Sequence, residues 1–288
     1  MELNNKKIFY VVNVDWFFLS HRKELAIEGI RRGYDVYLLA KDTGQFESLE
    51  KLGLKTIDIP FDRKKNSLFS DFKAFLKLCF LYNKYKPDII HHVTLKPIIF
   101  GSLASSFFSR KSKIINAVSG LGYAFIKSGK SILKSLILLS LKFITYLNKK
   151  NIKFIFQNSS DKNIFLKAKI SSNISSFIIK GSGVDELFFK PKSKVIKQGK
   201  IIRITLLARM LKDKGVLEFI KAAHIIHKKL KGKVLFRLVG GLDFANPAAL
   251  QEHEIKEMLI DNYLVWEGKS TDIVSVYDET DIACLPSY

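Results

Sequence analysis

Cysteine is scarce in this chain of 288 residues, which has only Cys79 and Cys284. Neither belongs to a Cys-x-x-Cys pair, and both lie in apolar runs, which favours buried free thiols in a reducing compartment. The N-terminus lacks the apolar core and the cleavage site of a signal peptide. No apolar run reaches the roughly 20 residues that a membrane-spanning helix needs. These absences predict a cytoplasmic protein.

Several catalytic signatures are also missing. The sequence has no Gly-x-Ser-x-Gly turn, no His-Glu-x-x-His motif and no P-loop. The glycine-rich fingerprint of nicotinamide-dependent enzymes does not follow the first predicted strand. The six histidines do not fall at metal-ligand spacings with cysteines or carboxylates. We therefore expect neither a metal nor a cofactor.

Acidic residues are few and unevenly spread. The chain has 48 Lys and Arg against 27 Asp and Glu, a net charge of +21. Residues 1–190 hold 32 basic and 15 acidic residues, a balance of +17, whereas residues 191–288 hold 16 and 12, a balance of +4. Residues 89–160 have no acidic residue and eleven basic ones. This pattern predicts attraction to a polyanion, either anionic lipid or nucleic acid. A solvated surface in a lysine-rich proteome explains it equally well.

The pattern of apolar residues predicts an α/β protein with two domains. In residues 1–190, short apolar runs alternate with helical periodicity, which is typical of βαβ units and a parallel sheet. We expect strands at 7–14, 36–40, 56–59, 89–93, 113–118, 154–157 and 176–179, and helices at 21–32 and 70–85. Residues 191–200 are polar and aperiodic, which indicates a linker.

A second α/β pattern begins after the linker and runs over residues 201–288. We expect strands at 201–208, 234–239, 263–266 and 282–285, and helices at 216–230, 251–261 and 270–280. Doubly wound sheets often have about six strands, more than this segment supplies. The chain ends at Leu285-Pro286-Ser287-Tyr288, where the last predicted strand enters a loop. Since ligands bind beyond the carboxyl ends of such strands, we expect the second domain to be incomplete.

Two basic residues follow the first strand of the second domain. Arg209 can bind phosphate oxygens with two hydrogen bonds, and Lys214 adds a compact charge at the start of the next predicted helix. Helix N-termini favour anions, so a diphosphate would fit here, although a basic turn explains the pair as well. Gly240 and Gly241 follow the next strand, where the backbone can approach a ligand closely. Gly183 lies in a similar turn shortly before the linker.

Polar residues also end strands of the first domain. Asn13, Asp15 and His21 lie in a predicted loop after the first strand, where they could bind a sugar beside Trp16 and Phe17. Alternatively, His21 is only the first residue of a helix.

Two further strands of this domain end in polar residues. His92 follows His91 at the end of another strand, where it could act as a general base or bind a neighbouring carbonyl. Ser119, beside Gly120, belongs to a ligand-contacting loop or to a flexible turn.

One helix is predicted over the mostly apolar residues 131–147. Its polar residues recur on one helical face together with Lys149: Ser131, Lys134, Ser135, Lys142 and Thr145. The helix could lie on anionic lipid or be a core helix with a solvated stripe. We favour the lipid because the helix lies within the acid-free segment.

Seven motifs occur in the same order as in bacterial family-four glycosyltransferases: VNVDWFFLSHR, PDIIHHVTLKP, NAVSGLGY, GSGVD, LLARMLKDKG, LVGGLD and DIACLPSY. The chain most resembles members that add a sugar to a lipid-diphosphate-linked acceptor. The resemblance implies the GT-B fold, with two Rossmann-like domains, and a retaining transfer from a UDP-sugar without a metal.

The resemblance also implies roles for single residues. Arg209 and Lys214 match the pair that holds the donor diphosphate, and Gly183, Gly240, Gly241 and Ser119 fall on the donor side. The acceptor side would be formed by Asn13, Asp15, His21 and His92. Ser119 stands where many relatives have a histidine. A loop with Glu-Gly-x-Pro and a second glutamate, expected to contact the donor sugar and ribose, would lie beyond Tyr288.

These observations favour one function over two alternatives. We expect a hexosyl- or N-acetylhexosaminyltransferase that acts on a lipid-linked saccharide in polysaccharide or glycan synthesis, peripheral on the anionic inner face of the plasma membrane. The first alternative is a truncated, inactive chain that only binds a membrane or a partner. The second is a basic nucleic-acid-binding protein; no RRM, KH or helix-turn-helix signature supports it, and we expect no nucleic-acid partner.

Overall fold

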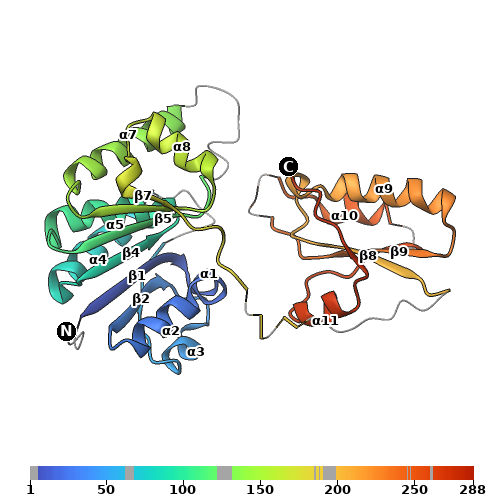
Figure 1. The fold of residues 1–288 in the computed structure, drawn as a ribbon, viewed down its shortest axis with the longest axis horizontal. Coiled ribbons are helices and arrows are strands. Elements are labelled where there is room, and N and C mark those ends of the chain that lie inside the picture. The colour runs from blue at the N-terminus through green and yellow to red at the C-terminus, as the bar shows by residue number, and fades with distance from the viewer. Residues whose placement is uncertain are drawn as a thin grey trace. The chain divides into compact units, whose positions relative to one another are not determined.

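The computed structural model describes residues 6–61, 68–121, 132–184, 186–187, 189–190, 199–244, 246, 248–259 and 262–288. The chain forms two compact units, one ending at Gly183 and the other beginning at Val184 (Figure 1). Most of the predicted linker, residues 191–198, lies outside the described residues. Each unit has its own sheet and core, and each is described by itself.

The first unit is built on a seven-stranded parallel sheet in the order β3-β2-β1-β4-β5-β6-β7. Its strands are β1 (Lys7–Val14), β2 (Asp35–Lys41), β3 (Lys55–Asp58), β4 (Ile89–Val93), β5 (Lys113–Val118), β6 (Ile152–Phe156) and β7 (Ser176–Ile178). The chain winds from β1 outward to β3 and then crosses back to β4, so the direction of winding reverses between β1 and β4. In parallel sheets this reversal is the place where ligands bind.

Helices cover both faces of this sheet. They are α1 (Asp15–His21), α2 (Lys23–Arg31), α3 (Phe46–Glu50), α4 (Leu68–Tyr85), α5 (Leu95–Phe108), α7 (Ile132–Leu147) and α8 (Ser159–Lys167). Side chains alternate along β1 as expected for a strand. Ile8, Tyr10 and Val12 pack with α1 and α2, whereas Phe9 and Val11 pack with α4.

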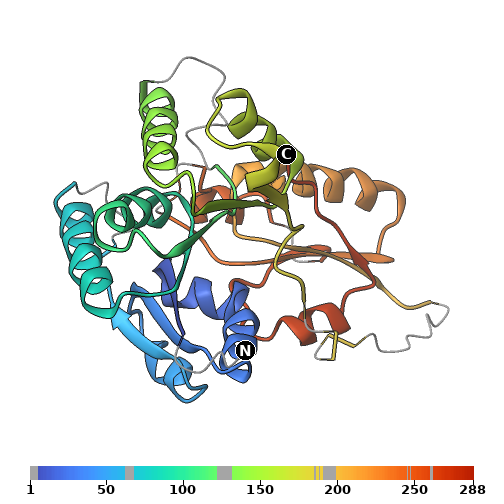
Figure 2. The ribbon, with the colours of Figure 1, turned by 60° about the vertical axis from the view of Figure 1, so that its left-hand side comes forward.

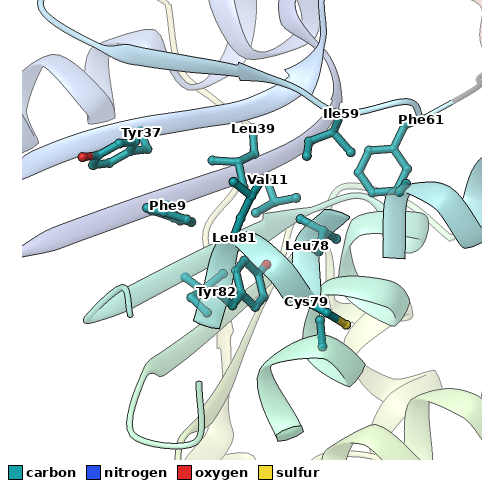
Figure 3. Packing of buried hydrophobic residues seen from close by; sticks show 13 residues of the cluster. Phe9, Val11, Tyr37, Leu39, Ile59, Phe61, Leu78, Cys79, Leu81 and Tyr82 are labelled. Atoms are coloured by element: carbon teal, nitrogen blue, oxygen red, sulfur yellow. The ribbon is translucent and has the colours of Figure 1, made fainter. Parts of the chain in front are cut away.

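Figure 3 shows the second of these cores, where Leu78, Leu81 and Tyr82 of α4 pack against strand residues. Cys79 belongs to the same cluster, and burial raises the pKa of its thiol to about 11. Its predicted burial is confirmed. Cys284 is only partly buried, so the prediction was wrong for that residue.

The second unit has a four-stranded parallel sheet in the order β10-β9-β8-β11. The strands are β8 (Ile202–Leu207), β9 (Val234–Val239), β10 (Leu264–Trp266) and β11 (Ile282–Ala283). The helices are α9 (Val216–Lys229), α10 (Glu252–Lys256) and α11 (Ile273–Asp278), with a short 3-10 turn at Lys212–Lys214. Phe219 and Ile220 of α9 pack on Leu206 and Phe236 of the strands to form the core.

The strand predictions are confirmed to within two residues at almost every boundary. Three predictions about helices and loops were wrong. Residues 15–21, predicted as a loop, form α1, and the helix predicted at 21–32 instead begins at Lys23 after a break at Arg22. The helix predicted at 251–261 is only α10.

Candidate functional site

The carboxyl ends of β8 and β9 lie side by side in the second unit, with Leu207 paired to Val239. Ala208 and Gly240 come next, and their backbones touch. A Cβ atom on Gly240 would lie 1.7 Å from the Ala208 oxygen, and the φ of Gly240 is +153°. Gly240 also donates its N–H to the Gly268 oxygen at 2.7 Å. Gly240 is therefore glycine because backbone packs against it, a reason that the sequence did not reveal.

Arg209 projects from this junction with its side chain about half exposed, 49%. Its Nη1 donates a hydrogen bond to the Asp243 carboxylate in the loop after β9. Backbone bonds hold that loop against the arginine segment: Met210 N–H donates to Gly241 O at 3.1 Å, and Leu250 N–H donates to Met210 O at 3.0 Å. The backbone next to Arg209 is therefore held by hydrogen bonds at both the N–H and the carbonyl of Met210.

Lys214 ends the 3-10 turn that precedes α9. The following Gly215 is left-handed, with a φ of +71°, and a Cβ atom there would lie 2.3 Å from the Pro286 oxygen. Tyr288 N–H donates to Asp213 O at 3.1 Å. The last residues of the chain therefore pack against the Lys214 turn and fix its shape. Together with the N-terminus of α9, Arg209 and Lys214 place positive charge at the carboxyl end of β8.

In the first unit, Asp15 begins α1 and is fully buried. Its carboxylate accepts hydrogen bonds from Thr43 N–H at 2.7 Å, Gln45 N–H at 3.0 Å and the Thr43 hydroxyl. Burial raises the pKa of Asp15, but these hydrogen bonds outweigh it and the net pKa is lowered. Asp15 therefore holds the loop after β2 against α1. That is a structural role, and the acceptor contact predicted for Asp15 stays a prediction.

Among the described residues of the first unit, four buried side-chain polar atoms have no hydrogen-bond partner: Asn13 Oδ1, His91 Nε2, Thr94 Oγ1 and Ser119 Oγ. They come from or directly follow β1, β4 and β5, which are neighbours in the sheet. Buried polar atoms are almost always paired, so four unpaired ones on adjacent strands mark a place where a polar ligand can bind. Burial is the main cause that lowers the pKa of His91, to about 3.

The backbone at this edge is also unusual. Thr94, between β4 and α5, has a φ of +74° although it is not glycine. The pairing of β1 with β2 shifts register between Val11 and Val14, which flank Asn13. Strained residues and bulges cluster at functional sites. Sequence reasoning selected Asn13 and Ser119 but missed Thr94, whose one available signal was its position between a strand and a helix.

His92 lies in the core, and its predicted role on the acceptor side stays a prediction. It is fully buried, its Nε2 accepts a hydrogen bond from the Tyr82 hydroxyl at 2.9 Å, and its Nδ1 donates to Asn116 Oδ1 at 2.8 Å. Burial lowers the pKa of His92 to about 4, against an opposing effect of the Asn116 bond. With both nitrogens engaged, His92 joins β4 to α4 and β5.

The remaining predicted residues lie on the surface. His21 is the last residue of α1, not the first of a helix, and its ring stacks on Phe17 at 4.3 Å. Gly183 has a φ of +74° in the turn before the second unit. The neighbouring Ser182 accepts a hydrogen bond from Arg22 Nη1 at 3.0 Å, which fixes this turn to the break between α1 and α2. Gly241 packs beside the side chain of Lys269.

Residues 7–158 match the glycosyl transferase 4-like family, and residues 188–288 match glycosyl transferases group 1. The first match alone covers more than half of the chain. The chain belongs to the glycosyl transferase 4-like family. Within the described residues, no three His, Cys, Asp or Glu gather in a way that could hold a metal ion.

Two curated relatives resemble this glycosyl transferase 4-like chain over most of its length. The capsular polysaccharide biosynthesis glycosyltransferase CapM of Staphylococcus aureus is 25% identical over 301 aligned positions, 99% of this chain and 74% of the relative. The UDP-Gal:alpha-D-GlcNAc-diphosphoundecaprenol alpha-1,3-galactosyltransferase of Escherichia coli is 26% identical over 266 positions, 88% of this chain and 66% of the relative. The chain thus spans about two thirds to three quarters of their lengths.

Solved structures confirm the predicted fold class, GT-B. Anabaena HepE in complex with UDP and glucose superposes with a TM-score of 0.71 and 17% identity, covering 98% of this chain and 74% of HepE. A glycosyltransferase from Rickettsia africae superposes with a TM-score of 0.69 and 19% identity, covering 99% of this chain and 73% of the Rickettsia chain. A UDP-N-acetylglucosamine 2-epimerase superposes with a TM-score of 0.62 and 14% identity, covering 97% of this chain and 74% of the epimerase. Because the fold also occurs in an epimerase, the function must be argued from the site.

Proposed function

We propose that this protein is a retaining glycosyltransferase that moves a hexose or N-acetylhexosamine from a UDP-sugar to a lipid-linked saccharide. The observation that carries the proposal is the placement of Arg209 and Lys214. Both lie between β8 and α9, on a backbone fixed by the Ala208–Gly240 contact and by Pro286. The names of the two curated relatives, one in capsular polysaccharide biosynthesis and one using a diphosphoundecaprenol-linked acceptor, support the acceptor class.

The positive charge at the end of β8 suits the leaving group of this reaction. As the bond between the sugar C1 and the diphosphate oxygen breaks, UDP keeps the electron pair and negative charge grows on the diphosphate. The acceptor hydroxyl oxygen bonds to C1, and its proton passes to the departing diphosphate oxygen. Arg209 can meet two phosphate oxygens with its planar donors, and Lys214 adds a point charge. Charges already in place stabilise the transition state without reorganisation.

Arg209 is engaged with Asp243 in the structure. Binding of a diphosphate would exchange the Asp243 carboxylate for phosphate oxygens, which keeps the guanidinium paired throughout. In the first unit, the unpaired oxygens of Asn13, Thr94 and Ser119 are suited to hydroxyl groups of a sugar.

We expect Arg209→Ala and Lys214→Ala each to weaken UDP binding about 10- to 100-fold, measured by isothermal titration calorimetry. A hydrogen bond to a charged group contributes about 1.5–3 kcal/mol, and 1.4 kcal/mol is a factor of about ten. Lys228→Ala is the matched control, because Lys228 is an exposed cation in the last turn of α9. Unchanged UDP affinity in both site variants would refute the assignment.

A transfer assay then separates the proposal from a non-catalytic chain. The assay uses a UDP-sugar and a short-chain lipid-diphosphate saccharide, and the product's anomeric configuration is read by NMR. Product with the configuration of the donor is expected. Binding of UDP without any transfer to acceptors of this class would favour the alternative of an inactive chain that only binds a membrane or a partner.

A further inference from the structure

Helices α4, α5 and α7 form one layer on the same face of the first sheet (Figure 2). α5 lies in the middle, in contact with both other helices, and is the most deeply buried of the three. The outer surface of this layer is therefore formed mainly by α4 and α7.

α4 is apolar on its outer side as well as on its inner side. Its inner residues, among them Leu78 and Tyr82, are buried in the core. Four outer side chains recur every three or four residues and are each at least 50% exposed: Phe69, Phe72, Leu76 and Phe80. A helix that only covers a core has charged and polar residues on its opposite face. Burial against the sheet therefore does not explain these residues.

α7 repeats this arrangement. Leu141 and Ile144 are buried in the core. Five large side chains recur on the outer side and are each at least 54% exposed: Ile132, Leu136, Leu139, Phe143 and Tyr146. Phe107 and Phe108, at the end of α5, are also exposed. Contiguous exposed apolar surface of this kind marks an interaction site.

Basic residues surround these apolar stripes. Exposed cations lie on or directly after the three helices: Lys73, Lys77, Lys84, Arg110, Lys111, Lys142, Lys149 and Lys150. Some extend over the exposed rings, with Lys73 Nζ 4.3 Å from the Phe69 ring centre and Lys149 Nζ 5.7 Å from that of Tyr146.

Acidic residues do not offset this charge. In the sequence of the three helices the only carboxylate is Asp71, which is 7% exposed and paired with Lys96 at 2.9 Å. The three helices themselves therefore present apolar side chains and positive charge, and no exposed carboxylate among their described residues.

We infer that the outer surface of α4 and α7 binds the surface of an anionic lipid bilayer. Aromatic and aliphatic side chains would enter the region between headgroups and acyl chains, and the lysines would contact anionic headgroups, as in amphipathic interfacial helices. In the described part of the chain, no helix is both long and apolar enough to cross a membrane.

The direction of the helices relates this surface to the candidate site. α5 and α7 follow β4 and β5, so their N-termini lie at the carboxyl edge of the parallel sheet, where the unpaired atoms of Asn13, Thr94 and Ser119 are. A bilayer against the layer would hold a lipid-linked acceptor beside that edge. This step rests on the proposed function, whereas the binding to lipid does not.

Flotation with vesicles tests the inference on the full chain. We expect the protein to float with vesicles of 30% phosphatidylglycerol in phosphatidylcholine and to stay unbound with phosphatidylcholine alone. Lys73→Glu/Lys77→Glu/Lys84→Glu should weaken binding by roughly 100-fold or more, since each basic residue near an anionic surface adds appreciable affinity. Phe72→Ser/Phe80→Ser/Leu139→Ser/Phe143→Ser should also abolish flotation, and these exposed positions should tolerate the change.

The matched control carries the same kinds of change on α9: Lys221→Glu/Lys228→Glu with Ile225→Ser, all at exposed positions. It should float like the wild type. Equal loss in the control, or wild-type flotation of the α4 and α7 variants, would overturn the inference. The inference would also be overturned if light scattering showed that the wild type is a dimer and the quadruple serine variant a monomer. A second copy of the chain would then cover the surface of α4 and α7. UDP binding of the same variants reports separately on the proposed function.

Discussion

Gly240 shows how one residue holds the candidate donor site together. The Ala208 carbonyl occupies the space that a side chain at this position would need, and that contact joins the ends of β8 and β9. The adjacent Gly241 is different. A Cβ atom there would lie 3.3 Å from Lys269 Cβ, a tight contact that a shift of a few tenths of an ångström relieves.

We therefore expect Gly240→Ala to lower the free energy of unfolding of the second unit by about 2–4 kcal/mol. A methyl group at 1.7 Å from a backbone oxygen forces the strand ends apart. Gly241→Ala should cost less than about 1 kcal/mol because Lys269 can move. Urea unfolding followed by fluorescence measures both, and similar losses in the two variants would contradict this account.

The two buried histidines of β4 make the first unit sensitive to acid. The pKa values of His91 and His92 are lowered to about 3 and 4, mainly by burial, from 6.5. In the unfolded chain both take up a proton below pH 6.5, whereas in the folded chain both stay neutral down to about pH 4. The free energy of unfolding is therefore not reduced by these two histidines above pH 6.5, and it decreases as the pH falls below 6.5.

Between pH 6 and pH 5, we expect the first unit to lose up to about 1.4 kcal/mol per pH unit for each histidine. His92→Gln, which keeps a donor and an acceptor, should remove about half of this slope. Urea unfolding at pH 7, 6 and 5 measures it. His253→Gln is the control, since His253 is an exposed residue of α10. An unchanged slope in His92→Gln would contradict the argument.

At the scale of single elements, strands could be predicted better than helices. Central parallel strands are buried on both faces, so their apolar runs stand out between polar turns. α5 could not be found in the same way because it has no charged face: the polar residues that recur along it are serines, and Ser102, Ser105 and Ser106 are buried. It lies between α4 and α7, and small residues bring it close to the sheet: a Cβ atom on Gly101 would lie 2.2 Å from His92 Nε2.

The segment after β1 was predicted as a loop because local signals are weak there. α1 begins at Asp15, whose carboxylate is held by Thr43 and Gln45, far along the chain. Such contacts between distant residues override local propensity and cannot be seen in a sequence.

The candidate site could be predicted only in part, for a related reason. The sequence reasoning selected polar residues at strand ends, and two of them, Asn13 and Ser119, have unpaired buried atoms. His91 and His92, as neighbours in a strand, point to opposite faces. The sequence does not show that one face offers His92 the partners Tyr82 and Asn116 while His91 Nε2 is left without one.

At the scale of the whole molecule, charge is divided between the two halves of the sequence. Residues 1–190 have a balance of 32 basic and 15 acidic residues, or +17, whereas residues 191–288 have 16 and 12, or +4. The proposed bilayer surface lies in the first unit and the proposed diphosphate site in the second. The excess charge of the first half therefore suits an extended anionic surface, and the second unit needs only two well-placed cations for a nucleotide.

This division predicts that the two binding activities can be lost separately. Arg209→Ala should weaken UDP binding and float like the wild type. Lys73→Glu/Lys77→Glu/Lys84→Glu should lose flotation and bind UDP within about twofold of the wild type. At 0.15 M salt the screening length is about 8 Å, so charges on α4 act mainly on their own surroundings. Calorimetry and flotation on the same preparations measure both, and loss of both activities in either variant would contradict the division.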